Sequence, residues 1–365
     1  MARNRRKQAA PAQSEPKTSQ RSAAEQAKPA QQRPKGAQQS LSKQRSRRER
    51  ERSRQIWIGA GLGGLVLLAL IGFVLWRNTN QSSSEAATTF QVGNVDSCRR
   101  TPQFAAGLGF GSAVSVSTSD AQRKGLLLID AEKSYQHPSW REAGSLGPFA
   151  IDRDGNIYTA PVPRVSPSDI APNSQRTIYK VDTQSGLMAP FLTLDGPDST
   201  PVNPFGILGL TYDCDTHSLY ATSVAGSDRE QERGQIVRID LATQTVVPQL
   251  TGVDAVGVGV VNRPEGKTLF FGTARASDVY SVLLDERGDL KGTPQWLFSF
   301  SELDVYGNAR VRRFAFSGAD SFQILTVPFG FNLRASSDRL QQTFLYRYDA
   351  ASATWLYQKP LPNER

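Results

Sequence analysis

The chain has 365 residues, a formal net charge of +9, two cysteines and two histidines. With so few His and Cys residues, a zinc site of ordinary ligand spacing is not expected. The charge is unevenly placed, because residues 1–54 hold sixteen Lys or Arg against four Glu, a net of +12, which leaves −3 for the other 311 residues. The basic character therefore belongs to the N-terminal tail.

The tail, residues 1–54, is rich in Gln, Ala, Ser, Pro, Lys and Arg and contains no Val, Ile or aromatic residue. It buries too little apolar surface to fold alone, so we expect it to be disordered. A basic segment beside a membrane attracts anionic lipid headgroups, by about 1 kcal/mol per Lys or Arg near the surface. Without aromatic residues for base stacking, it does not favour nucleic acid. A solvated topology signal without a specific partner is the simplest interpretation.

Residues 55–77 enclose an apolar stretch, IWIGAGLGGLVLLALIGFVLW at 56–76, without a charged or amide side chain. At about 1.5 Å of rise per residue, a helix of this length spans the roughly 30 Å hydrocarbon core of a bilayer. The stretch is too long and too far from the N-terminus for a cleaved signal peptide, so we predict an uncleaved, single-pass signal-anchor helix. Six arginines crowd its N-terminal side and only Arg77 follows it. The positive-inside rule then places the tail in the cytoplasm and the C-terminal domain outside the cell membrane.

The glycines of this stretch have two interpretations. Gly59, Gly61 and Gly64 match G-x-G-x-x-G as a string, but no strand precedes them and no acidic residue follows at ribose-binding distance, so a dinucleotide site is rejected. The pair Gly59 and Gly63 fits a small-xxx-small pattern, which would allow a helix-mediated dimer. Glycine is also common in membrane spans, and the pattern then has no such meaning.

Residues 78–103 are rich in Ser, Thr, Asn and Gln, and their first half predicts a flexible extracytoplasmic stalk. Both cysteines, Cys98 and Cys214, are expected on the outer side, where disulfides persist. A bond between them would close a loop of 116 residues and stabilise the domain by about 4 to 5 kcal/mol in the chain-entropy model. Nothing in the sequence fixes their Cα atoms near the roughly 6 Å that a bridge requires, so we expect two unpaired thiols, with a disulfide as the alternative.

Residues 104–365 consist of short apolar and β-branched runs separated by Gly, Pro, Asp, Asn and Ser, which predicts an all-β domain. One module recurs. It begins with a small-residue strand, a polar turn and a second strand, as in FAIDRDGNIYTA at 149 and GVVNRPEGKTLFFGTA at 259. It continues with an alternating strand that ends in Asp, as in TIYKVD at 177 and QIVRID at 235.

The closing aspartates of these modules, Asp130, Asp182, Asp240, Asp285 and Asp349, are 45 to 64 residues apart. A four-stranded unit of about fifty residues is typical of a β-propeller blade, so we predict a β-propeller domain over 104–365. Five blades can be counted, the first degenerate, and six is the alternative if the stalk or residues 135–146 supply further strands. Five equivalent aspartates around a ring indicate turn caps rather than catalysis.

Three strings, GPFAIDRDGNIYTA, NPFGILGLTYDCDTHSLYAT and RPEGKTLFFGTARASDVYSVLLDERGDL, resemble the repeats of extracytoplasmic propellers of the NHL, YVTN and gluconolactonase-like type. The resemblance covers most of 147–292. It implies architecture more than activity, since such blades serve both binding proteins and enzymes. A gluconolactonase-like enzyme would hold a divalent cation such as calcium in its channel. However, Ala274 and Arg275 stand where that family places an acidic residue, and Asn203 precedes Pro204 in the reverse of its order. No metal-site residue carries over, and no cofactor is expected.

Other candidates for chemistry are weak. There is no G-x-S-x-G string, and the two histidines, His137 and His217, are expected in loops. The string Asp152-Arg153-Asp154-Gly155-Asn156 resembles the opening of a calcium loop, but its Gly stands fourth instead of sixth. We interpret it as a hairpin turn, and no catalytic residue is predicted.

The lengths of the loops indicate a candidate binding face. Connections between second and third strands are long, as at 161–176, 224–234 and 328–342, and they share one face of a propeller with the loops that enter the inner strands. An Arg surplus there suits acidic or carboxylate-bearing partners, although such charges are also common in solvated loops. The candidate binding residues of this face are Arg164, Arg176, Asn203, Asp228, Arg229, Arg275, Asp278, Arg310, Arg312 and Arg334.

The sequence thus predicts a single-pass membrane protein whose extracytoplasmic propeller binds a protein, glycan or other envelope component through its long-loop face. The alternative is a metal-dependent, lactonase-like hydrolase with its site in the channel. A third interpretation is structural support for a larger membrane complex through the span and tail.

Overall fold

The computed structural model describes residues 90–118, 124–163, 172–331 and 341–358, all within the unit Ser83–Arg365. Among these residues no helix is long and apolar enough to cross a membrane. The predicted tail, the predicted span and residues 78–89 of the predicted stalk lie outside them.

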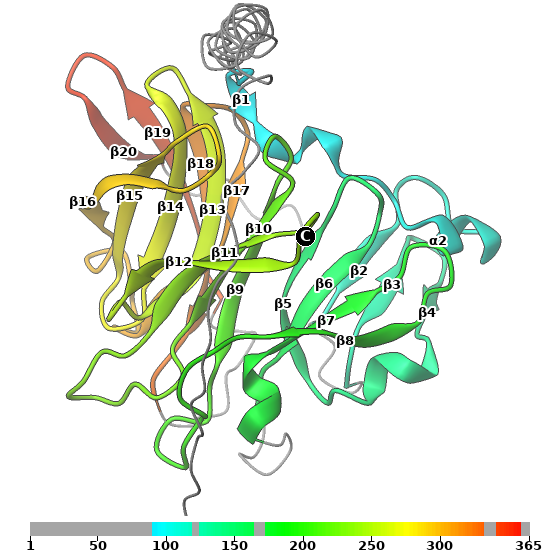
Figure 1. Cartoon of the computed structure of the whole chain (residues 1–365). Helices are drawn as coiled ribbons and strands as arrows, with labels where there is room; N and C mark the ends of the chain where they lie inside the picture. Colours follow the sequence, from blue (N-terminus) through cyan, green and yellow to red (C-terminus); the bar gives the residue numbers. More distant parts are fainter. Residues whose placement is uncertain (1–89, 119–123, 164–171, 332–340, 359–365) are drawn as a thin grey trace, which may run out of the picture. The chain divides into compact units, whose positions relative to one another are not determined.

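Five antiparallel sheets form in the described part of the chain, in the order expected for propeller blades (Figure 1). Blade 1 comprises β2 (Ser115–Ser117), β3 (Leu127–Ile129) and β4 (Ser134–Tyr135). Blade 2 comprises β5 (Leu146–Ile151), β6 (Ile157–Pro161), β7 (Thr177–Val181) and β8 (Met188–Thr193). Blade 3 comprises β9 (Ile207–Asp213), β10 (Ser218–Ser223), β11 (Gln235–Asp240) and β12 (Thr245–Thr251). Blade 4 comprises β13 (Ala255–Arg263), β14 (Gly266–Thr273), β15 (Asp278–Leu284) and β16 (Leu290–Ser299). Blade 5 comprises β17 (Ala309–Phe316), β18 (Ser321–Pro328), β19 (Thr343–Asp349) and β20 (Thr354–Gln358). The prediction of an all-β propeller with five blades is confirmed.

The first strands of blades 2 to 5 lie side by side, since β9 packs against β5 and β13, and β13 packs against β17. Every residue of β9 is buried, because a blade covers it on each side. Small residues allow this approach: a Cβ on Gly209 would lie 2.4 Å from the Val256 carbonyl oxygen, and one on Gly257 would lie 2.6 Å from that of Val311. Glycine at these two positions of the inner strands therefore lets neighbouring blades approach closely.

Apolar clusters join each blade to the next. The largest aromatic cluster lies between blades 4 and 5, where the Phe270 ring contacts Phe316, Phe322 and Trp355 edge-on at 5.4 to 5.7 Å between centroids. Other clusters join blades 1 and 2, blades 2 and 3, and blades 3 and 4. Among the described residues no such cluster joins blade 5 to blade 1.

The repeated aspartates cap turns, as predicted. In each blade the side chain of this aspartate accepts hydrogen bonds from backbone N–H groups two and three or four residues later. These bonds lower the pKa of Asp130, Asp182 and Asp240, because they stabilise the charged carboxylate. In blades 2 to 5 the capped turn joins the third strand to the fourth.

Blade 1 is incomplete. Its capped turn at Asp130 joins β3 to β4, so β2, β3 and β4 correspond to the second, third and fourth strands of the other blades. No first strand precedes β2 in the described residues from 90 onward. The prediction of a degenerate first blade is thus confirmed. The six-blade alternative is not supported, since residues 138–141 form the 3-10 helix η2 (Pro138–Arg141).

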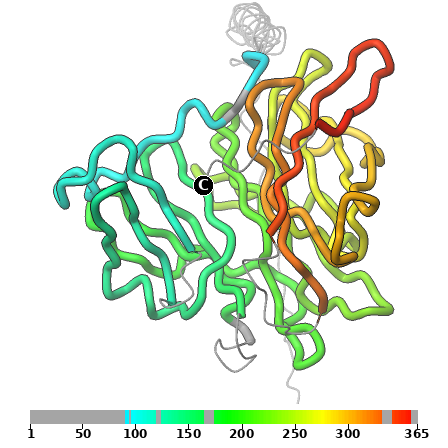
Figure 2. Tube along the Cα trace, turned by 180° about the vertical axis from the view of Figure 1, so that it is seen from behind, coloured from blue at the N-terminus to red at the C-terminus, as the bar shows by residue number. Residues whose placement is uncertain are grey.

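A segment before blade 1 runs across one face of the ring, visible in cyan in Figures 1 and 2. We call residues 90–107 the strap; they contain β1 (Gly93–Asn94), η1 (Val95–Cys98) and α2 (Gln103–Gly107). β1 pairs with the end of β13, the Arg100 N–H donates to the Asp152 carbonyl at 3.4 Å, and the Phe104 N–H donates to the Thr183 carbonyl at 2.9 Å. The strap therefore contacts blades 4 and 2, and the second half of the predicted stalk belongs to the folded unit.

The strap also carries a disulfide. Cys98 in η1 is bonded to Cys214 in the turn after β9, with the Cα atoms 5.9 Å apart. The expectation of two unpaired thiols was wrong, because strap pairing with blade 4 brings Cys98 beside the blade 3 turn. The face of the ring that carries the strap and the first-to-second-strand turns is called the strap face, and the opposite face is the long-loop face.

Candidate functional site

Arg275 ties together the connection between β10 and β11 on the long-loop face. Its Nη2 lies 3.0 Å from Oδ2 of the fully buried Asp254, and its Nε lies 3.1 Å from Oε1 of Glu232. Its Nη1 and Nη2 donate to the backbone carbonyls of Arg229 and Asp228, both at 2.7 Å. This guanidinium is therefore held by four groups of the fold and fixes the loop.

The guanidinium of Arg310 is also held by hydrogen bonds to backbone carbonyls. Its Nε donates to the Ala274 carbonyl at 2.9 Å and its Nη2 to the Arg275 carbonyl at 3.0 Å. Burial lowers its pKa, and the negative charges of Asp304 and Asp278 oppose that change. The structure thus brings together five predicted site residues, Asp228, Arg229, Arg275, Asp278 and Arg310, in an arrangement that holds loops in place.

The other predicted residues of this face make contacts of their own. Arg176 pairs with Asp198 at 2.8 Å, and the Nδ2 of the fully buried Asn203 donates to the Val224 and Ser227 carbonyls at 2.7 and 2.9 Å. Arg164 and Arg334 lie outside the described residues. Arg312 lies in the channel, as described below.

Exposed apolar side chains stand at the tips of two loops that enter inner strands. Val202, between β8 and β9, is 65% exposed, and Val305 and Tyr306, between β16 and β17, are 79% and 53% exposed. Each tip adjoins a buried polar anchor. Asn203 anchors the first, and in the second the Asp304 carboxylate accepts from the N–H groups of Tyr306 and Ala309 at 3.1 and 2.7 Å. The tips are thus presented on fixed backbone.

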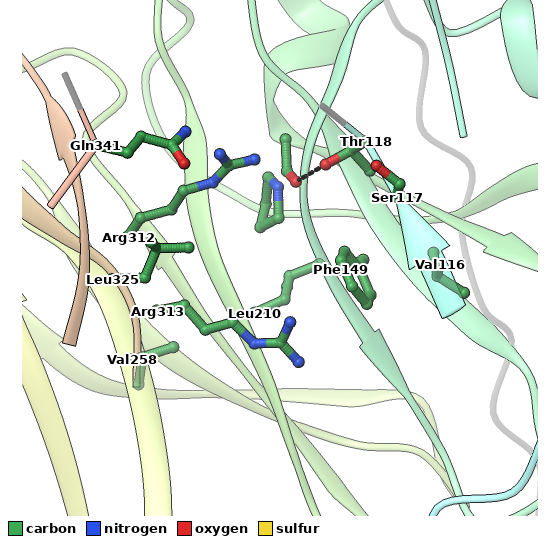
Figure 3. A pocket seen from close by; sticks show the side chains of 12 residues that line it. Val116, Ser117, Thr118, Phe149, Leu210, Val258, Arg312, Arg313, Leu325 and Gln341 are labelled. Atoms are coloured by element: carbon green, nitrogen blue, oxygen red, sulfur yellow. Dashed lines mark hydrogen bonds between the residues drawn. The ribbon is translucent and has the colours of Figure 1, made fainter. Parts of the chain in front are cut away.

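A cavity of about 200 Å³ lies in the channel between the inner strands (Figure 3). Its apolar wall includes Phe149, Leu210, Val258 and Leu325, and the full lining is Val116, Ser117, Thr118, Gly147, Pro148, Phe149, Leu210, Val258, Arg312, Arg313, Leu325 and Gln341. Blade 1 has no first strand in the described residues, and Val116, Ser117 and Thr118 of this blade line the cavity opposite blade 5. There the Thr118 hydroxyl donates to the Gly147 carbonyl at 2.8 Å.

Two consecutive arginines line this cavity because of an irregularity in β17. Successive side chains of a regular strand point to opposite faces. Pairing of β17 with β18 shifts between Val311 and Arg313, which pair with Thr326 and Leu325. A bulge re-aims a side chain, so Arg312 and Arg313 both reach the cavity. In Figure 3 Arg313 extends toward Phe149, and its guanidinium carbon lies 5.0 Å from the centre of that ring.

Among the described residues, Asp96 is a carboxylate within electrostatic reach of Arg313. Burial raises the pKa of Asp96, and the charges of Arg99 and Arg313 oppose that rise. Asp96 is itself paired with Arg99 at 2.5 Å.

The described residues do not fit a divalent cation. Within the described ranges no group of three or more His, Cys, Asp or Glu side chains could hold a metal ion, and the two channel arginines would repel one. The string 152–156 is a hairpin turn, as predicted, since β5 ends at Ile151 and β6 begins at Ile157. The oxygens of Asp152 accept from groups of that same hairpin, including Asn156 Nδ2 at 2.8 Å and Tyr158 Oη at 3.1 Å.

The two histidines lie away from the cavity lining. His137 precedes η2, and its Nδ1 accepts from the Ser139 N–H at 3.2 Å. His217 lies in the turn between β9 and β10, where its Nδ1 is 2.8 Å from the Tyr212 hydroxyl and 3.2 Å from Arg153 Nε. Burial and the charge of Arg153 lower the pKa of His217. Both are loop residues.

Arg313 and Phe149 were not predicted as site residues. The string RVRRFAF at 310–316 reads as an alternating strand, in which only one of two neighbouring arginines would face the channel. A pair of adjacent arginines in an inner strand is the one signal that could have pointed to them.

No protein-family model matches the chain, and no curated protein matches it. Solved structures do resemble it. Hydrazine synthase from Kuenenia stuttgartiensis has 13% identity and a TM-score of 0.41, over 71% of this chain and 64% of that one. The calcium-binding protein regucalcin from Agrobacterium tumefaciens has 13% identity and a TM-score of 0.38, over 73% and 77%. The extracellular domain of a putative one-component system from B. thetaiotaomicron has 12% identity and a TM-score of 0.37, over 66% and 26%.

The chain thus spans about a quarter of the length of the last of these proteins and under two thirds of hydrazine synthase. At such identities the likenesses concern the fold alone. The propeller architecture rests on the sheet topology, and the finer resemblance to NHL, YVTN or gluconolactonase-like repeats stays an expectation from the sequence.

Proposed function

We propose that this chain is a membrane-anchored, extracytoplasmic binding module that recognises a protein or glycan component of the cell envelope through its long-loop face. The observation that carries the proposal is the pair of anchored loop tips, in which large apolar side chains, Val202, Val305 and Tyr306, stand in solvent. Apolar and aromatic side chains on fixed backbone are typical anchors of a binding surface, because little conformational entropy is lost when they are covered.

The loops around these tips support the same function. Arg275 and Arg310 use their donors on neighbouring carbonyls and carboxylates, so the connection at 228–232 is held before any partner arrives. Preorganisation of this kind raises affinity by reducing the cost of ordering. Arg229 and Glu230 remain exposed beside it and would supply a polar rim.

The strap leaves the long-loop face open. β1 pairs at the turn end of β13, opposite the loops that carry Val202 and Val305, and both of these side chains remain exposed.

The alternative, a metal-dependent lactonase-like hydrolase, is less well supported, because the described channel presents arginines where a cation would require oxygen ligands. No specific observation favours an enzyme over a binding module.

Site-specific photo-crosslinking in membranes tests the proposal. The full-length chain would carry a photoreactive amino acid at Val305 or, as a matched control, at Leu187, which is 53% exposed in the turn between β7 and β8 on the strap face. We expect a discrete adduct from position 305, weakened by Asp304→Ala, which removes the anchor of that tip. The same adducts from both positions, or an adduct from 187 alone, would contradict recognition by the long-loop face.

A further inference from the structure

A buried cluster on the strap face holds an amine against a carboxylate. We propose that Lys267 and Asp213 condense to an amide that covalently joins blades 3 and 4. Asp213 is the last residue of β9 in blade 3, and Lys267 lies in β14 of blade 4, 54 positions later in the chain. The proposal concerns a modification of the folded domain and does not rest on the proposed binding partner.

The two reacting groups are already in contact. Nζ of Lys267 lies 2.5 Å from Oδ1 of Asp213, and both side chains are inaccessible to solvent. The Phe90 ring of the strap covers the amine, with its centre 4.3 Å from Nζ. Well-oriented groups of one molecule reach effective concentrations of about 10⁵ to 10⁸ M. A site closed to water also protects the product from hydrolysis.

Condensation requires the amine and the acid in their neutral forms. In water an ammonium and a carboxylate are the stable pair, whereas burial penalises both charges. The contact between Nζ of Lys267 and Oδ1 of Asp213 allows one proton to pass from the nitrogen to the oxygen. This transfer gives a neutral amine beside a neutral acid.

Neighbouring groups supply the rest of the reaction. Nζ forms a bond to Cγ of Asp213, and the negative charge that develops on Oδ2 is stabilised by the Thr216 hydroxyl, which donates to Oδ2 at 2.7 Å. Oδ2 of Asp215 lies 2.7 Å from Nζ and takes the second proton from the nitrogen. That proton passes to the Oδ1 hydroxyl as the Cγ–Oδ1 bond breaks. The products are one amide and one water molecule, with no change in oxidation state.

Asn262 carries a second carbonyl carbon in the same cluster. Its Nδ2 donates to Oδ2 of Asp215 at 2.7 Å and to the Gln91 carbonyl at 3.0 Å, so this amide is held by Asp215 and by the strap. Nζ of Lys267 instead lies directly against Asp213, which makes Asp213 the expected partner. Attack on Asn262 would release ammonia in place of water, so the mass lost distinguishes the two reactions.

Intact-mass spectrometry of the full-length chain, after reduction and denaturation, tests the proposal. We expect the mass to lie below that of the mature sequence by one water molecule, and proteolysis to yield a branched peptide that joins Asp213 to Lys267. Lys267→Arg keeps the positive charge but lacks the primary amine, and it should show the full mass of its own sequence. Asp215→Asn removes the base and should do the same. The matched control Asp320→Asn, at an exposed carboxylate of blade 5, should retain the loss of water.

Three outcomes would overturn the proposal. The unmodified protein could have the full mass of its sequence. Lys267→Arg could retain the loss of water, which dehydration at Asp195-Gly196 would then explain. A loss of ammonia with a branched peptide between Asn262 and Lys267 would assign the bond to a different residue. The first and third results come from the unmodified protein, so misfolding of a variant would not obscure them.

Discussion

The strap face and the long-loop face of this propeller differ in the contacts that their side chains make. On the strap face polar groups are paired internally: Cys98 is bonded to Cys214, and the buried Lys267 Nζ lies 2.5 Å from Asp213 Oδ1 and 2.7 Å from Asp215 Oδ2. On the long-loop face, apolar tips remain in solvent. The strap face thus holds the disulfide and the buried ion pair, whereas the long-loop face carries the most exposed apolar tips, Val202 at 65% and Val305 at 79%, and substitutions should separate the two contributions.

Removal of the disulfide should have the largest effect. The double substitution Cys98→Ser and Cys214→Ser opens a loop with a sequence separation of 116 residues. In the chain-entropy model this lowers the free energy of unfolding by about 4 to 5 kcal/mol. Denaturant unfolding of the full-length protein, with and without reductant, measures this change in the free energy of unfolding. An unchanged midpoint would mean that the strap does not hold the fold.

The substitution Lys267→Ala should cause the next largest loss in the free energy of unfolding. Asp213 and Lys267 are both inaccessible to solvent, and loss of the amine leaves a buried carboxylate unpaired, which costs about 3 to 5 kcal/mol. Asn262 Nδ2 also donates to Asp215 at 2.7 Å and cannot replace the charge. Chemical denaturation measures the change in the free energy of unfolding. The matched control is Arg347→Ala, whose exposed pair with Asp320 spans 3.8 Å and contributes about 0 to 1 kcal/mol.

The smallest effect concerns pH. The pKa of His217 is lowered in the folded protein by burial and by Arg153, so the unfolded chain takes up a proton first as pH falls. Stability should therefore be complete above about pH 6.5, the unfolded value, and decline below it until the folded pKa is passed. His217→Asn should flatten this part of the profile, because Asn does not titrate and tolerates the φ of 50° at this position. A profile identical to that of the unmodified protein would exclude His217 as the cause.

Much of the fold was predictable, because turn chemistry repeats. The strand-ending aspartates identified every blade, since each caps the same type of turn. The strap was not predictable from pattern, because β1 has two residues and pairs with a strand more than 160 positions later. For the same reason the sequence could not place Cys98 beside Cys214.

Site residues were less predictable than the fold. Arg275, Arg310 and Asn203 carry the residue types of a binding site, but their donors bond to carbonyls and carboxylates that only the folded chain brings near. Conversely, Arg313 reaches the channel through a bulge, which shifts the register by one residue and leaves no mark in the strand pattern. Charge type is therefore visible in a sequence, but whether that charge is already paired is not.

The most direct test of an anchored, extracytoplasmic binding module is labelling of intact cells with a membrane-impermeant maleimide. The full-length chain would carry Val305→Cys on the long-loop face or Ser40→Cys in the basic tail. We predict that the cysteine at 305 is labelled in intact cells and that the cysteine at 40 is labelled only after permeabilisation. Labelling of both positions only after permeabilisation would place the propeller inside the cell and contradict the proposal.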